Sequence, residues 1–463
     1  MTIPLPDHDP GQFDLADRHA LRRVVGLSTE LQDVTEVENR QLRLERVVLV
    51  GVQFGTQRDA ENSLRELAAL AETAGSEVLD GLLQRRTKPD PATYIGSGKA
   101  KELAAIVAST GADTVVADSE LQPSQRRALE DVVKVKVIDR TALILDIFAQ
   151  HAKSREGKAQ VELAQLQYLL PRLRGWGDSM SRQAGGRVAG GDGIGSRGPG
   201  ETKIELDRRR INSRIAKLRR EIAAMKVGRT TKRSSRRRRE TPSVVIAGYT
   251  NAGKSTLINR LTGAGVLVED ALFATLDPTV RRAETADGRA YTISDTVGFV
   301  RALPHQLVEA FRSTLEEVED ADLVLHVVDG AHPDPMGQIS AVREVFADID
   351  AGDVPELLVV NKADAADPND LDVLLSNLPG AVAVSARTGD GIAELRATID
   401  SALPRPAVTI DVLVPYDRGD LVTMLHNRAD IDTIEYLADG TAITGKAYPG
   451  VASAVEAYAR SAP

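Results

Sequence analysis

One stretch near the middle of the chain constrains its fold more than any other. The apolar run Ser243-Val-Val-Ile-Ala precedes Gly248-Tyr-Thr-Asn-Ala-Gly-Lys-Ser255, and a helical pattern follows. Glycines at 248 and 253 let the backbone turn its N–H groups toward phosphate oxygens, and the helix adds its positive N-terminal end. A strand, a Gly-x-x-x-x-Gly-Lys-Ser loop and a helix in this order predict a phosphate-binding loop in an α/β domain with a parallel sheet.

The same loop predicts roles for its side chains. Lys254 is expected to neutralise the β- and γ-phosphates, and Ser255 to bind Mg²⁺ through its hydroxyl. Asn251 either holds K⁺ or suits the loop conformation, and the residues leave both explanations open. The predicted nucleotide-contacting residues of this loop are Gly248, Tyr249, Thr250, Asn251, Ala252, Gly253, Lys254, Ser255 and Thr256.

A second motif follows about forty residues later, where a strand pattern ends in Asp295-Thr-Val-Gly298. Asp295 can hold Mg²⁺ through water, and the Gly298 N–H can contact a γ-phosphate. Thr296 and Val297 are included in this predicted site. The next position is Phe299, where Ras-like proteins place a glutamine that orients the attacking water. Phenylalanine cannot do this, so we expect slow intrinsic hydrolysis that depends on a partner or another element.

The segment between these motifs is the natural place for a threonine that closes over the metal. It contains Phe273, Ala274, Thr275, Leu276 and Asp277, followed by a second threonine at position 279. Spacing alone does not decide between the two threonines.

A further pair of motifs predicts which base is bound. Asn361-Lys362-Ala363-Asp364 follows a buried-strand pattern, and Ser385-Ala386-Arg387 follows another. The Asp364 carboxylate can accept from guanine N1–H and N2–H₂, which adenine lacks. Asn361 is expected to brace the loop, Lys362 to lie across the base, and the 385–387 backbone to reach guanine O6. These motifs select GTP over ATP.

The organisation along the chain is α/β and multidomain. Residues 1–44 are a polar extension, and strands alternating with helices predict a parallel α/β domain over 45–140. Residues 241–404 form the GTPase domain, and 405–463 a small α+β domain with a strand at 408–414, a helix at 421–428 and two further strands. Within the first α/β domain, Ser124 is the expected N-cap of a helix over 124–133.

Residues 141–240 predict a basic helical hairpin. Its helices are expected over 141–173 and 201–226, packed through leucines and isoleucines spaced three and four apart. A glycine-rich tip spans 175–200, and a loose basic linker spans 226–240. In a chain of net charge −9, residues 151–240 carry 24 lysines and arginines against 9 aspartates and glutamates, a local charge of +15. That asymmetry indicates a polyanionic partner.

The tip combines arginines and the single tryptophan, which suit contacts to RNA backbone and bases. The alternative is a flexible linker, but a linker has no need of arginines. The RNA-contacting candidates are Arg172, Arg174, Trp176, Arg182, Arg187 and Arg197.

Composition narrows the remaining possibilities. The chain has no cysteine, which excludes disulfides and thiolate metal sites, and an aromatic content of 3% makes base stacking an unlikely main binding mode. No apolar run is long enough to span a bilayer, and the N-terminus does not resemble a signal peptide. We therefore expect a cytoplasmic protein.

Another glycine–lysine turn lies in the N-terminal domain, at Tyr94-Ile-Gly-Ser-Gly-Lys99. It could bind an anion, but position 93 is threonine where a P-loop has its first glycine. An RNA-phosphate contact or a structural turn is the favoured reading.

Together these residues resemble the HflX family of ribosome-associated GTPases. The resemblance rests on Gly198-Pro-Gly-Glu-Thr-Lys-Ile-Glu205, Phe273–Asp277 and Asp295–Phe299. It implies binding of the 50S subunit and its rRNA, with the glycine-rich tip reaching toward the peptidyl-transferase centre. It further implies splitting or rescue of stalled or hibernating 70S ribosomes. It favours Thr275 as the Mg²⁺-binding threonine, and gives Lys254, Thr275 and Gly298 the catalytic roles.

Two other functions remain open at this stage. One is a GTP-switched protein that binds ribosomes or RNA without splitting them, and the other is an RNA-remodelling ATPase that uses the N-terminal domain. Two features depart from the pattern of the family, namely the basic run over 226–239 and the polar first 44 residues.

Overall fold

The computed structural model describes residues 46–175, 199–238, 241–263, 272–273, 279–285, 288–301, 307, 311, 315 and 317–460. The predictions for the extension 1–44, for most of the tip and for Ala274–Asp277 lie outside these residues. Among the helices described, none combines the length and the apolar character that a membrane crossing requires.

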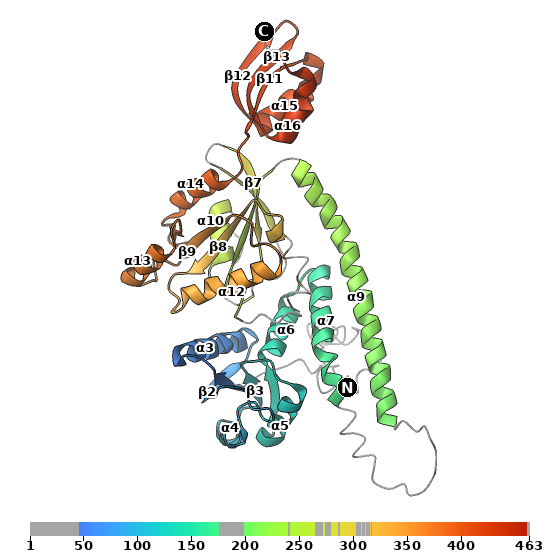
Figure 1. Cartoon of the computed structure of the whole chain (residues 1–463), viewed down its shortest axis with the longest axis vertical. Helices are drawn as coiled ribbons and strands as arrows, with labels where there is room; N and C mark the ends of the chain where they lie inside the picture. Colours follow the sequence, from blue (N-terminus) through green and yellow to red (C-terminus); the bar gives the residue numbers. More distant parts are fainter. Residues whose placement is uncertain are drawn as a thin grey trace, which may run out of the picture.

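The N-terminal unit is a parallel four-stranded sheet in the order β2-β1-β3-β4, flanked by helices (Figure 1). The central strand β1 is a run of valine and leucine buried on both faces, as a covered parallel strand requires. Its elements are β1 (Arg46–Gln53), α3 (Gln57–Thr73), β2 (Glu77–Arg85), α4 (Ser97–Thr110), β3 (Thr114–Ala117), α5 (Pro123–Val133) and β4 (Lys136–Asp139). The prediction of Ser124 as an N-cap is wrong, because α5 begins at Pro123 and Gln122 caps it.

The single helix predicted over 141–173 is in fact two. Helix α6 (Arg140–His151) ends at Ala152, whose backbone is extended, and α7 (Arg155–Leu169) starts after Ser154. The Ser154 side chain accepts a hydrogen bond from the Gly157 N–H at 2.8 Å, so it caps a new helix. A short 3₁₀ turn, η1 (Arg172–Gly175), follows.

The second hairpin helix is longer than predicted. Helix α9 runs from Pro199 to Arg238, so the prediction of a loose basic linker from 226 is wrong for the backbone as far as Arg238. The predicted seam with α7 is confirmed. Ile211, Ile215 and Leu218 are buried in a cluster with Ala159 and Leu163. Figure 1 shows α9 lying along α7 and continuing well beyond it.

The middle unit is a six-stranded sheet in the order β10-β9-β8-β5-β7-β6, parallel except for β6. This order brings the carboxyl ends of β5, β7, β9 and β10 to one edge, where a predicted motif follows each strand. The elements are β5 (Ser243–Gly248), α10 (Lys254–Thr262), β6 (Val280–Glu284), β7 (Ala290–Asp295), β8 (Leu323–Asp329), α12 (Pro335–Asp348), β9 (Glu356–Asn361), α13 (Pro368–Asn377), β10 (Val382–Ala383) and α14 (Ile392–Ala402).

The last unit is an antiparallel three-stranded sheet in the order β11-β13-β12 with helices packed against it. This confirms the expected small α+β fold. Strand β11 has the predicted bounds 408–414, and β12 and β13 are longer than the strands expected around 434–437 and 442–447. Its elements are β11 (Val408–Val414), η2 (Tyr416–Arg418), α15 (Gly419–Arg428), β12 (Ala429–Leu437), β13 (Gly440–Ala447), α16 (Pro449–Val455) and η3 (Glu456–Tyr458).

The N-terminal and middle units share one apolar core. Phe148 of α6 packs edge-on against Phe273 at a ring-centroid distance of 4.6 Å and against Phe311 at 5.1 Å. Leu49 and Leu67 of the N-terminal unit belong to the same buried cluster as these rings. The two α/β units are therefore packed together next to the predicted nucleotide loops.

Candidate nucleotide-binding site

The loop after β5 has the geometry of a phosphate-binding loop because its two glycines leave no room for a side chain. A Cβ atom on Gly248 would lie 2.2 Å from the Val327 carbonyl oxygen of the neighbouring strand β8. A Cβ atom on Gly253 would lie 2.2 Å from Asn361 Nδ2, and the φ of Gly253 is +88°. Both positions require glycine, and the second brings the guanine-reading motif against the loop.

Asn251 adopts a left-handed backbone conformation with a φ of 58° and is exposed. Asparagine tolerates this conformation better than most residues. The loop therefore has a conformational reason for asparagine at this position, whatever its role toward K⁺.

Lys254 is the first residue of α10 and is 7% exposed. Its Nζ donates to the carbonyl oxygens of Gly248 at 3.0 Å and Tyr249 at 2.8 Å, so the side chain folds back over its own loop. Burial lowers the pKa of the Lys254 amine to about 8, and the charge of Asp295 opposes that shift. The ammonium group is poised where phosphate oxygens would be cradled.

Ser255 and Asp295 come together from different motifs. The Ser255 hydroxyl donates to Asp295 Oδ2 at 3.2 Å, and Asp295 is 3% exposed at the end of β7. A hydroxyl and a carboxylate are hard oxygen ligands of the kind Mg²⁺ prefers, with phosphates and water completing its shell. Within the described residues, no group of three or more His, Cys, Asp or Glu could hold a metal by itself.

The segment after Asp295 lies against the phosphate loop. The Thr250 N–H donates to the Phe299 carbonyl oxygen at 2.7 Å, and the Phe299 N–H donates to the Gly248 carbonyl oxygen at 3.2 Å. A Cβ atom on Gly298 would lie 2.7 Å from Thr250 Cγ2 and 3.1 Å from Lys254 Nζ. Gly298 is therefore the residue that allows this segment to approach the lysine.

Phe299 points into the core instead of toward the nucleotide. It is 2% exposed, and its ring packs edge-on against Phe346 at 6.0 Å. The two residues before Gly298 in the motif also make contacts inside the fold. Thr296 donates to the Ile246 carbonyl oxygen at 2.9 Å, and Val297 is buried. No side chain at these three positions is placed to orient a water molecule.

Asn361 joins the two halves of the site. Its Nδ2 donates to the Ala252 carbonyl oxygen at 2.8 Å, and its Oδ1 accepts from the Ala386 N–H at 3.0 Å. Lys362 has a left-handed φ of 61°, and its Nζ lies 2.8 Å from Asp329 Oδ2 at the end of β8. One side chain thus fixes the spacing between the phosphate loop and the base-reading loops.

Asp364 is paired with Arg387 across the predicted guanine pocket. A hydrogen bond from Ser385 and the adjacent Arg387 guanidinium hold the pKa of the Asp364 carboxyl below its usual range. The Arg387 side chain is 80% exposed, so it can leave the carboxylate without unpacking the fold. A guanine base would replace Arg387 as the partner of Asp364.

The sequence analysis did not identify several residues that contact the candidate site. Asp329 follows a buried strand, the same signal that identified Asp295, and could have been found. Glu66 of α3 accepts a hydrogen bond from the Tyr249 hydroxyl at 2.7 Å, across 183 residues of sequence. No local pattern marks that contact.

The prediction of Arg172 as an RNA contact is wrong in this structure. Arg172 is 7% exposed, with its guanidinium 3.4 Å from the centre of the Tyr168 ring. It pairs with Glu120 at 3.0 Å and with Asp139 at 3.3 Å. The group ties η1 to the N-terminal sheet. The side chain of Arg174, and Trp176, Arg182, Arg187 and Arg197, lie outside the described residues.

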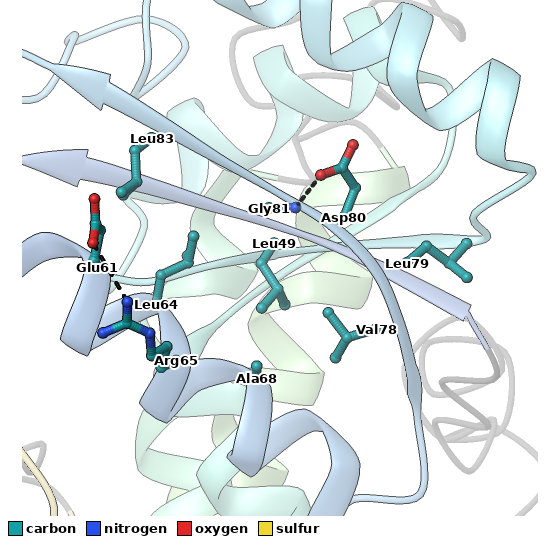
Figure 2. Close-up of a pocket in the computed structure, with 10 residues that line it drawn as sticks. All are labelled: Leu49, Glu61, Leu64, Arg65, Ala68, Val78, Leu79, Asp80, Gly81 and Leu83. Carbon is teal, nitrogen blue, oxygen red and sulfur yellow. Dashed lines mark hydrogen bonds and ion pairs between the residues drawn. The ribbon is translucent and has the colours of Figure 1, made fainter. Parts of the chain in front are cut away.

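A hollow of about 370 Å³ lies elsewhere, between α3 and the edge strand β2 (Figure 2). Apolar side chains such as Leu49, Leu64 and Val78 line it, with the Glu61–Arg65 ion pair at its rim. None of its lining residues belongs to the four nucleotide motifs. The hollow is therefore separate from the candidate nucleotide-binding site on the middle sheet.

Comparison with known proteins agrees with this placement. Residues 61–149 match the family described as GTP-binding GTPase N-terminal, 151–236 the GTP-binding GTPase middle region, and 243–362 the 50S ribosome-binding GTPase family. GTPase HflX of Lacrimispora saccharolytica is 43% identical over 414 residues, which are 89% of this chain and 94% of that protein. GTPase HflX of Escherichia coli is 43% identical over 400 residues, 86% of this chain and 92% of that protein.

A solved structure of a GTP-binding protein from Sulfolobus solfataricus in complex with GDP also matches. It is 24% identical, covers 77% of this chain and 98% of its own, and has a TM-score of 0.41.

Proposed function

Because the chain belongs to the HflX family of GTPases, we propose that it acts on the large ribosomal subunit. It binds the 50S subunit through rRNA, and couples GTP binding and hydrolysis to splitting or rescue of stalled or hibernating 70S ribosomes. The observation that carries the proposal is a long, basic helix, packed against α7 and continuing to Arg238, just before a GTPase domain in which the residue after Gly298 is the buried Phe299.

Helix α9 has the charge distribution of an RNA-binding surface. Ile211, Ile215 and Leu218 pack in the cluster with α7, whereas four arginines are exposed, namely Arg208, Arg209, Arg219 and Arg220. At 1.5 Å per residue its 40 residues extend about 60 Å. Arginines presented over such a length suit the phosphate backbone, because each neutralised phosphate releases counterions. The tip arginines remain proposed rRNA contacts, but Arg172 does not.

The nucleotide site supports a division of roles among its own residues. Lys254 and the loop N–H groups bind the phosphates, and the Gly298 N–H reports the third phosphate. Ser255 and Asp295 would hold Mg²⁺, with Thr275 as the threonine that closes over it. The metal would supply charge neutralisation at the phosphate oxygens. Asp364 reads guanine, and Asn361 sets the distance between base and phosphates.

The interior position of Phe299 supports dependence on a partner. Arginine fingers and positioned glutamines can change the turnover of GTPases by about 10³–10⁵-fold. A GTPase without such a group at this position keeps GTP until the missing group is supplied, and the ribosome would supply it. This mode of action places the protein in the cytoplasm, as a monomer when off the ribosome. A K⁺ ion held by Asn251 is a further candidate for the positive charge that an arginine finger supplies in other GTPases.

The test of ribosome splitting is light scattering of 70S particles mixed with the protein and a non-hydrolysable GTP analogue. Splitting predicts a rapid fall in scattering with the intact chain. It also predicts no fall with a variant lacking residues 185–198, whose intrinsic GTP turnover should be retained. Co-sedimentation with 50S subunits without any fall in scattering would support the alternative, a GTP-switched binding protein that does not split ribosomes.

A further inference from the structure

One carboxylate of the N-terminal unit hydrogen-bonds to the phosphate loop. Glu66 of α3 accepts a hydrogen bond from the Tyr249 hydroxyl at 2.7 Å, and Tyr249 is the second residue of the phosphate loop. The Arg301 N–H donates to the Tyr249 hydroxyl oxygen at 2.5 Å and lies 3.3 Å from Glu66 Oε1. Glu66 therefore joins the phosphate loop to the chain three residues beyond Gly298.

Glu66 is itself held in place by a buried cation. Arg140, 4% exposed at the start of α6, donates to Glu66 Oε1 at 2.5 Å and to Asp118 Oδ1 at 2.9 Å. A buried charge is tolerated only when paired and hydrogen-bonded, so this arrangement fixes the Glu66 carboxylate in one position. Burial, reinforced by the Glu66 charge, raises the pKa of Tyr249, which keeps its hydroxyl protonated as a donor.

The groups that Glu66 holds are those that surround a γ-phosphate. The Tyr249 carbonyl oxygen accepts from Lys254 Nζ at 2.8 Å, and Tyr249 pairs with Phe299 in a parallel bridge. Gly298 lies between this bridge and Lys254. The far side of Arg301 is anchored as well, because its guanidinium lies 3.2 Å from Asp334, the N-cap residue of α12.

Phe148 provides a second contact from the same unit. Its ring packs against Phe273, which leads into the segment containing Thr275, and against Phe311, ten residues beyond Arg301. The N-terminal unit thus contacts both chain segments that would close over the nucleotide. The hydrogen bonds of Glu66 and the ring contacts of Phe148 are therefore both part of the interface between the N-terminal and middle units.

We propose that Glu66 is a positioning residue for GTP. Acting through Tyr249 and the Arg301 N–H, it holds Gly298 against the phosphate loop in the arrangement that a third phosphate requires. GDP has no γ-phosphate and makes no use of that arrangement. The N-terminal unit therefore raises the affinity for GTP over GDP, in the absence of any ribosome.

The test uses the full chain and two conservative variants, Tyr249→Phe and Glu66→Gln. Dissociation constants for GDP and for a non-hydrolysable GTP analogue are measured by isothermal titration without ribosomes. Loss of positioning equivalent to one ordinary hydrogen bond predicts about a 3- to 10-fold weaker affinity for the analogue, with GDP affinity changed less than about 2-fold. Tyr291→Phe, at a buried tyrosine of β7 outside the cluster, is the matched control and should change neither.

A double variant separates positioning from general damage. If both side chains act through the same hydrogen bond, the double variant Tyr249→Phe/Glu66→Gln loses no more affinity for the analogue than the single variant with the larger loss. Thermal unfolding of each variant identifies any loss of folding. Equal weakening of GDP and analogue, full additivity of the two changes, or a gain in analogue affinity would each overturn the proposal.

Discussion

Two loops of this chain place a glycine and a lysine at the start of a helix, and they are built in opposite ways. In the middle unit, Lys254 is buried and donates to two carbonyl oxygens of its own loop. In the N-terminal unit, Lys99 forms an ion pair with Glu102, three residues further along the same helix. The first lysine covers its loop, and the second turns away from it.

The space inside the loops differs as well. The atom closest to a Cβ built on Gly253 belongs to Asn361, a residue of the base-reading motif. At Gly96 the closest atom is Arg86 Nη1, at 2.3 Å. Arg86 donates to the Ile95 carbonyl oxygen at 3.3 Å and pairs with Asp90 at 3.2 Å. A protein cation with its own carboxylate occupies the second loop, which supports a structural turn there and speaks against an ATP site.

The largest expected effect separates the two lysines directly. Lys254→Ala should weaken GTP binding at least about 100-fold, because the phosphates lose their buried counter-charge. Lys99→Ala should leave GTP binding unchanged. Fluorescence titration with a labelled GTP checks both, and far-UV circular dichroism confirms the fold. Loss of nucleotide binding in Lys99→Ala would contradict the contrast between the loops.

A somewhat smaller loss of GTP affinity is expected from a change in the guanine-reading motif. The loop at residues 96–99 of the N-terminal unit was not predicted to have such a motif. Asp364→Asn should weaken the affinity for GTP about 30- to 100-fold, since the charged acceptor for two guanine donors is lost. The same variant should gain affinity for xanthosine triphosphate, whose C2 oxygen can accept from the new amide. Competition titrations with both nucleotides measure the switch. Unchanged preference for guanine would show that Asp364 does not read the base.

The smallest effect concerns the loop that we regard as structural. Arg86→Ala should lower the free energy of unfolding by about 1 kcal/mol, because Asp90 and the Ile95 carbonyl lose a partner. GTP affinity should not change. Urea denaturation measures the free energy of unfolding. The Lys99→Ala protein is the comparison, and its free energy of unfolding should fall by less. A change in nucleotide binding without a change in stability would assign this loop a ligand.

Local sequence was sufficient for the features that depend on backbone geometry. The glycine pattern predicted a loop whose backbone needs glycine at 248 and 253. The structure shows that a Cβ atom at either position would lie 2.2 Å from a neighbouring atom, a contact that the pattern did not identify. Alternating strand and helix patterns predicted both parallel sheets. The isoleucine spacing in α9 predicted the seam with α7, because each of those side chains is buried on one face of a helix.

The errors came from contacts between distant residues. Arg172 is buried because Asp139 and Glu120, 33 and 52 residues earlier, supply the charges that pair with it. Its position beside a glycine-rich stretch indicated exposure instead. Glu66 was not singled out, since its role depends on Tyr249 and Arg301 in another unit. The break at Ser154 was missed because the capping interaction spans only three residues inside a longer helical pattern.

We propose that GTP hydrolysis by this chain depends on the ribosome, since Phe299 leaves the water-orienting position without a polar group. The most direct measurement is GTP turnover by the full chain with and without purified 50S subunits, with Lys254→Ala as the inactive control. Dependence on the ribosome predicts slow turnover by the chain alone and at least about a 10-fold rise in kcat as 50S subunits saturate the protein. Equal turnover at every concentration of 50S subunits would contradict it.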